Sequence, residues 1–365
     1  MLSEREFRRP YGAEKLLKRI EALCLGKGPI RFMEICGTHT MAIAKAGLRA
    51  VLPGNLRLVS GPGCPVCVTP SGAIDGILRL SGEKGLMIAS YGDLLRVPGS
   101  RPGDTLARRK ALGARVQTVY SPMEALALAE ENPALQVVFL GVGFETTAPG
   151  TAACVLEARE RGLGNFSLLC LLKRTEPALR ALIAAPDFAV DGFLCPGHVA
   201  AVTGAEAFSF LPREFGLPAV VSGFEPTDLV YSVCRLADML ARREPALENE
   251  YTRLVGWEGN LPALKAVEEV FRPVSSLWRG LGEIRESGYG LKEEFAPWDA
   301  ARRFGFSEHR GAEPPGCRCG QVIRGVCSPE QCPLFGGACT PSDPVGPCMV
   351  SGEGACAAAY RYGRA

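Results

Sequence analysis

Short apolar runs alternate with amphipathic, helix-like segments along most of this chain of 365 residues. The apolar runs are rich in Val, Ile and Leu, which is typical of parallel strands that helices cover on both faces. We expect such strands at 31–35, 56–60, 86–90, 115–120, 137–140, 168–172, 188–194 and 219–222. Regular alternation of strands and helices predicts parallel α/β sheets.

The pattern changes toward both ends of the chain. Apolar positions at helical spacing predict an amphipathic helix over residues 11–25. From about 229 to 304 the pattern becomes mostly helical, and a segment rich in Gly, Pro and Cys follows. We therefore expect an α/β protein with two Rossmann-like parallel-sheet domains, at 30–120 and 121–245, and a third, mostly helical region that carries the cysteines.

Composition and charge exclude several classes of protein. The net charge of +2, with acids and bases interspersed, gives no reason to expect binding to nucleic acid or an anionic membrane. No apolar run reaches the roughly 18–20 residues that span a bilayer. The first 15 residues are charged and lack the apolar core of a secretory signal. We expect a cytoplasmic protein, in which 15 cysteines indicate metal or redox chemistry more often than structural disulfides.

Seven of the 15 cysteines lie within residues 317–356. Four of them follow the spacing C-x12-C-x6-C-x16-C, namely Cys319, Cys332, Cys339 and Cys356. Four thiolates suit either a tetrahedral zinc ion or an iron–sulfur cluster. These four are widely spaced and form no short C-x2–4-C knuckle among themselves, which favours a [4Fe–4S] cluster over zinc or disulfides. Spacing alone leaves the choice of ligands open, since the same segment also contains Cys317, Cys327 and Cys348.

A second thiol site is the sequence Cys64-Pro65-Val66-Cys67, between a Gly-Pro-Gly turn and the expected start of a helix. A helix N-terminus stabilises thiolate and lowers the pKa of a cysteine, which makes Cys64 and Cys67 a candidate pair for reversible disulfide exchange. Half of a zinc site, or two buried cysteines without function, are the alternatives.

A third thiol site is Cys36-Gly37-Thr38-His39, which follows the first expected strand. The spacing allows Cys36 and His39 to share a metal ion, or His39 to act as a base toward Cys36. A buried cysteine beside a histidine that only makes hydrogen bonds is the alternative.

Other polar residues also follow expected strands directly: Asp93, Glu145 and His198. Ligands of open α/β sheets bind at the carboxyl ends of the strands, so these side chains and the thiols are expected to converge between two sheet edges. A solvated loop carboxylate is the commoner role for Asp93 and Glu145. No phosphate-binding loop is present, and Gly141-x-Gly143 lacks the third glycine of a dinucleotide fingerprint, so nucleotide binding is not supported.

Taken together, the motifs CGTHT, GPGCPVCVTP, YGD, GFETT, PGHV and CMVSGEGAC closely resemble those of the HypD family of hydrogenase formation proteins. The resemblance covers residues 34–360. It implies a third domain built from both ends of the chain, 1–29 with 246–365, that carries a [4Fe–4S] cluster. It also implies a maturation factor for [NiFe] hydrogenase. With a HypC-type chaperone, such a protein carries an iron ion while two cyanides and one carbon monoxide are attached. A HypE-type donor supplies the cyanide, and the hydrogenase large subunit receives the finished group.

The resemblance assigns roles to particular residues. The iron-binding cysteine corresponds to Cys36, with His39 beside it, and the redox pair corresponds to Cys64 and Cys67. The cluster ligands correspond to Cys319, Cys332, Cys339 and Cys356. Glu145 and His198, in the GFETT and PGHV motifs, complete the set of catalytic candidates. Two rival functions are a stand-alone iron–sulfur reductase of protein disulfides and a scaffold whose cluster is purely structural.

Overall fold

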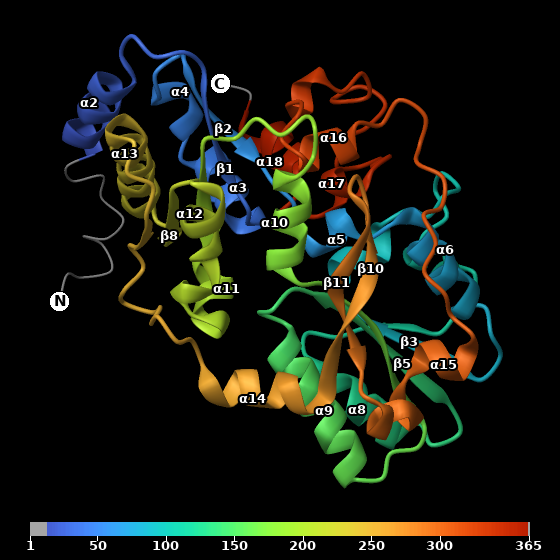
Figure 1. Cartoon of the computed structure of the whole chain (residues 1–365). Helices are drawn as coiled ribbons and strands as arrows, with labels where there is room; N and C mark the ends of the chain where they lie inside the picture. Colours follow the sequence, from blue (N-terminus) through green and yellow to red (C-terminus); the bar gives the residue numbers. More distant parts are fainter. Residues whose placement is uncertain (1–12, 364–365) are drawn as a thin grey trace.

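The computed structural model describes residues 13–363 (Figure 1). Two predictions fall partly or wholly outside this range: the absence of a secretory signal in residues 1–15, and the first two residues of the helix predicted at 11–25. The described chain contains two parallel sheets and one antiparallel hairpin, with helices packed around them. The predicted α/β class is confirmed.

Sheet A has five parallel strands in the order β2-β1-β7-β8-β9. They are β1 (Ile30–Glu34), β2 (Leu56–Ser60), β7 (Gly192–Pro196), β8 (Ala219–Ser222) and β9 (Leu247–Asn249). One face packs on α2 (Ala13–Cys24), α3 (Gly37–Lys45), α4 (Leu48–Val51) and α13 (Pro226–Arg242). The other packs on α10 (Thr175–Ile183), α11 (Gly197–Thr203), η2 (Ala205–Phe208) and α12 (Phe210–Phe215).

Sheet B has four parallel strands in the order β4-β3-β5-β6. They are β3 (Leu86–Ser90), β4 (Val116–Thr118), β5 (Gln136–Gly143) and β6 (Phe166–Leu172). One face packs on α8 (Pro122–Glu131), α9 (Ala148–Glu160), α14 (Leu261–Val270) and η3 (Glu293–Trp298). The core on the other face includes α5 (Pro65–Val68), α6 (Ser71–Leu80), η1 (Gly92–Arg96), α7 (Leu106–Ala111) and α15 (Ala300–Phe304).

The two sheets are interleaved along the chain. Sheet A takes its first two strands from before sheet B and its last three from after it. Each of the expected ranges 30–120 and 121–245 therefore contributes strands to both sheets. The apolar pattern located all eight expected strands, but strand order depends on contacts between distant segments, which a local pattern does not contain.

Two features differ from the sequence-based expectations. Helix α2 packs against α13, where Arg19 Nη2 donates to Asp238 Oδ1 at 2.8 Å, instead of with the cysteine segment (Figure 1). The segment 229–304, expected to be mostly helical, also contains a hairpin of β10 (Phe271–Trp278) and β11 (Gly282–Leu291). Exposed and buried positions alternate only in parts of these strands, and the register shifts between Val274 and Ser276, which obscures the strand period in the sequence.

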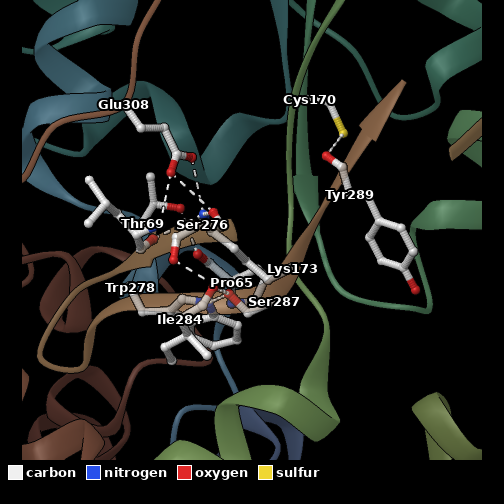
Figure 2. Close-up of polar contacts among 11 residues, drawn as sticks. Pro65, Thr69, Cys170, Lys173, Ser276, Trp278, Ile284, Ser287, Tyr289 and Glu308 are labelled. Atoms are coloured by element: carbon white, nitrogen blue, oxygen red, sulfur yellow. Dashed lines mark hydrogen bonds and ion pairs between the residues drawn. The ribbon is translucent and has the colours of Figure 1, made fainter. Parts of the chain in front are cut away.

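A buried lysine fixes the hairpin to sheet B. Lys173, at the end of β6, is fully buried and its Nζ donates to Ser276 Oγ, to the Leu277 carbonyl at 3.1 Å and to Glu308 Oε1 at 3.2 Å (Figure 2). Glu308 Oε2 in turn accepts from Ser276 Oγ at 3.1 Å and from the Leu277 amide at 3.0 Å. All three ammonium hydrogens thus have acceptors, as a buried charge requires.

The C-terminal cysteine segment packs between the sheets, beside α3 and α5 (Figure 1). Its short helices are α16 (Cys319–Ile323), η4 (Pro329–Gln331), α17 (Pro347–Val350) and α18 (Ala355–Tyr362). Between residues 13 and 363, no helix is both long and apolar enough to cross a membrane.

Candidate functional site

The carboxyl ends of both sheets face one cavity of about 240 Å³. Its walls from sheet A include Cys36, Gly63 and His198, and its walls from sheet B include Phe144 and Thr147. In sheet A this is the point between β1 and β7 where the strand order reverses, the usual ligand position in an open α/β sheet. The structure therefore brings Cys36 and His198 together from loops that are far apart in the sequence.

Cys36 lies two residues after the end of β1 and is the N-cap residue of α3. Burial raises the pKa of its thiol to about 11, although the backbone N–H groups of His39 and Thr38 favour the thiolate. The negative charge of Glu353 adds to the increase in pKa. In the free cavity at neutral pH, Cys36 is consequently a thiol, and a metal ion would have to displace its proton.

Glu353 is a site residue that the sequence analysis missed. It lies in the loop between α17 and α18, and its Oε1 accepts a hydrogen bond from Thr38 Oγ1 at 2.8 Å. It also lines a second cavity of about 260 Å³, which Asp93 and Tyr91 border at the end of β3. The motif CMVSGEGAC contains Glu353, but nothing local in that sequence indicates contact with a loop more than 300 residues earlier.

His39 is buried, and its ring is directed into sheet A. Nε2 donates to the carbonyl oxygens of Gly223 at 2.9 Å and Ser222 at 3.2 Å, which leaves Nδ1 without a partner among the described residues. Burial lowers the pKa of His39 to about 4, so the ring is neutral at pH 7. The ring of Phe224 lies between it and His198, with centroid distances of 4.5 Å and 3.9 Å respectively. His198 thus lines the cavity, whereas His39 packs on Phe224, behind the cavity wall.

Cys64 and Cys67 form a disulfide across the first turn of α5. Both side chains are buried and belong to the same hydrophobic core as the cysteine segment. Gly63 carries this turn against the Cys36 loop: its carbonyl accepts from the Gly37 amide at 3.1 Å, and a Cβ at Gly63 would lie 2.3 Å from the Cys36 nitrogen. The redox candidate and the iron-binding candidate therefore share a backbone contact.

Glu145 is not among the residues that line the cavity. Its buried carboxylate accepts hydrogen bonds from the Thr175 amide at 2.6 Å and from Thr175 Oγ1 at 2.7 Å. Burial raises the pKa of Glu145, and the two donors of Thr175 oppose that increase. Glu145 thus fixes the start of α10, one residue from Thr146 in the cavity wall.

The four cysteines assigned to a cluster converge around one small pocket. The pocket is lined by Cys319, Cys332, Cys339 and Cys356, together with Cys317 and the apolar side chains of Leu334, Phe335 and Met349. Hydrogen bonds from neighbouring thiols, Cys319 first, lower the pKa of Cys356. Among the described residues, no three Cys, His, Asp or Glu have the arrangement of a single-ion site. Soft thiols with an apolar wall fit a sulfur-bridged iron cluster by donor chemistry, since such a cluster binds one thiolate at each iron.

The geometry first defines a class: an α/β protein in which a lone thiol and a disulfide-bearing turn meet between two parallel sheets, next to a cysteine-lined pocket. The HypD family model, described as "Hydrogenase formation hypA family", matches residues 12–363. The chain is 44% identical over 365 residues to hydrogenase maturation factor HypD of Azotobacter vinelandii, covering 98% of this chain and 96% of that protein. It is 43% identical over 363 residues to hydrogenase maturation factor HypD of Escherichia coli (strain K12), covering 98% and 97%. The chain belongs to the HypD family of hydrogenase maturation factors, as its motifs predicted.

Proposed function

We propose that this chain is the cytoplasmic scaffold on which the Fe(CN)2CO group of [NiFe] hydrogenase is assembled. A HypC-type chaperone shares the iron, a HypE-type partner donates cyanide, and the hydrogenase large subunit receives the finished group. The observation that supports this proposal best is the position of Cys36. It lines a cavity between two sheet edges and touches the backbone of the turn that carries Cys64 and Cys67.

Cys36 is the proposed ligand of the iron substrate. Low-spin iron(II) with strong-field ligands favours a soft thiolate, so iron binding releases the proton of Cys36. Glu353 and His198 line the same cavity. The pKa of His198 is lowered by burial, so its ring is neutral at pH 7 and offers an acceptor for that proton. His39 and Glu145 position the loops around the cavity, through their bonds to Gly223 and Thr175.

The disulfide of Cys64 and Cys67 is the proposed two-electron store. Its reduction consumes two electrons and two protons and yields two thiols. A [4Fe–4S] cluster held by Cys319, Cys332, Cys339 and Cys356 supplies one-electron chemistry when bound, with an external one-electron donor as the source. The shared hydrophobic core of the disulfide and the cysteine pocket supports this division of roles. The dithiol then provides the electrons for releasing cyanide from a thiocyanate carrier.

Anaerobic purification with the chaperone, iron counting and infrared spectroscopy test the proposal. Cyanide and carbonyl stretches are expected in the wild type and should disappear in Cys36→Ala, whereas Cys234→Ala, a buried cysteine in α13, is the matched control. Stretches that persist in Cys36→Ala would refute the scaffold.

The same preparation distinguishes the rival functions. A double variant Cys64→Ala/Cys67→Ala should lack the complete group, and a complete group in that variant would favour a scaffold with a structural cluster. Turnover on a protein disulfide, without bound extra iron, would instead favour a disulfide reductase.

A further inference from the structure

A buried arginine closes the turn that carries the disulfide. Arg279, at the tip of the β10–β11 hairpin, is 3% exposed. Its backbone amide donates to the Val68 carbonyl at 2.7 Å, and its Nε donates to the Thr69 carbonyl at 3.1 Å. These carbonyls belong to the last residue of α5 and its C-cap, directly after Cys67. The guanidinium thus holds the end of the disulfide turn in place.

The tip of the hairpin also contacts the cysteine segment. A Cβ at Gly280 would lie 2.6 Å from the Cα of Gly320, so the hairpin tip touches the backbone next to Cys319. The hairpin tip therefore contacts both the turn that carries the disulfide and the segment that carries the cysteine pocket.

One edge of the guanidinium is left without a protein acceptor. Nη1 pairs with Glu313, but Nη2 is buried and has no hydrogen-bond partner within residues 13–363. Leaving a buried donor unpaired is unfavourable, and more so when the group is charged. An acceptor that the polypeptide does not contain would remove this cost. Beside a pocket of cysteines, the acceptor that matches the site is sulfur.

We propose that Arg279 is a positioning residue of the redox pathway, which holds the disulfide turn against the cysteine pocket and donates Nη2–H to a sulfur of the group bound there. The inference rests on the proposed [4Fe–4S] cluster. A cation and an N–H···S bond stabilise the reduced, more negative cluster and raise its reduction potential. Glu313, whose side chain is 47% exposed, partly neutralises Arg279 and opposes that effect.

Redox titration of the cluster in the anaerobically prepared full-length protein tests the proposal, followed by visible absorption and electron paramagnetic resonance. In Arg279→Gln, the ratio of oxidised to reduced cluster at a fixed ambient potential should rise about tenfold, equivalent to about 59 mV for one electron. Glu313→Gln should move this ratio in the opposite direction, because it unmasks the charge of Arg279. Arg302→Gln, which removes a half-exposed arginine paired with Glu293, is the control and should leave the ratio unchanged.

The opposite signs separate an electrostatic role from a merely structural one. Arg279→Gln and Glu313→Gln shifts of the same sign, or no shift in either while the cluster is present, would overturn the inference and leave the scaffold proposal intact. A wild-type protein without a cluster would overturn both. If Arg279→Gln fails to fold, the sign of the Glu313→Gln shift decides alone.

Discussion

The ion pair of Lys173 and Glu308 should be the most sensitive point of the hairpin region to mutation. Glu308→Ala removes one of the three acceptors of the fully buried ammonium, and it removes Oε2, the shared acceptor of the Ser276 hydroxyl and the Leu277 amide. Loss of one partner of a buried pair costs about 3–5 kcal/mol, and we expect the lower end because the Glu308 side chain is 21% exposed. With an unfolding entropy of about 2.1 cal/mol/K per residue, 365 residues give a Tm decrease of roughly 4 °C.

Thermal and urea unfolding would measure the loss, with Glu293→Ala as the control. Glu293 is 81% exposed and also pairs with an arginine, so its loss should cost less than about 1 kcal/mol. The double variant Lys173→Met/Glu308→Ala should recover much of the stability, because it leaves no unpaired buried charge. An effect of Glu308→Ala no larger than that of the control would refute this reasoning.

The same variant carries a pH signature. Burial already lowers the pKa of Lys173 below its usual 10.5, and removal of Glu308 lowers it further. In the variant, the unfolded state binds more protons than the folded state at pH values between the lowered pKa of Lys173 and 10.5. The destabilisation relative to the wild type should therefore shrink as the pH rises from the pKa of Lys173 in the variant to its value in the wild type, which itself lies below 10.5. A destabilisation that stays constant over that range would exclude the charged lysine as its cause.

Three further predictions concern the Cys36 cavity. Gly63→Ala should lower the Tm and disturb the Cys36 loop, because its Cβ meets backbone, whereas Gly150→Ala, with open space, should be neutral or stabilising by up to about 1 kcal/mol. With a pKa of about 11, Cys36 should react with iodoacetamide at pH 8 roughly 20-fold more slowly than an ordinary thiol. Labelling should accelerate as the pH rises through 11. Over the same range, the folded protein should lose the stability that the protonated thiol contributes. Labelling that does not depend on pH would contradict this prediction. Glu353→Gln should accelerate labelling at pH 9, because it removes a charge that raises the pKa of Cys36; an unchanged rate would exclude that effect.

Much of the fold follows from local sequence, because burial by helices leaves long apolar runs in each parallel strand. The loops after these runs were correctly expected at the carboxyl edges, and Cys36 and His198 meet there. The local sequence pattern did not, however, predict in which direction individual side chains point. The spacing of Cys36 and His39 was compatible with both side chains facing one site. The His39 ring instead makes hydrogen bonds to the carbonyl groups at the end of β8, a strand far along the chain.

The residues that the sequence analysis missed share one property. Glu353, Lys173 and Arg279 each become significant through a partner at least 100 residues away. A charged residue in a loop or at a strand end is normally solvated, so no local pattern separates these three from the others. Long-range packing alone gives them their burial and their partners.

Because the strands of sheet A flank those of sheet B in the chain, the amino-terminal thiol loop cannot be completed early in synthesis. β1 can pair with β7 only after β7 has been synthesised. The hydrogen bond of Thr38 with Glu353 joins positions that are 315 residues apart. A ribosome must therefore synthesise almost the whole polypeptide before the enclosed space around Cys36 exists. Prematurely terminated chains would contain Cys36 but not the late segments that enclose it.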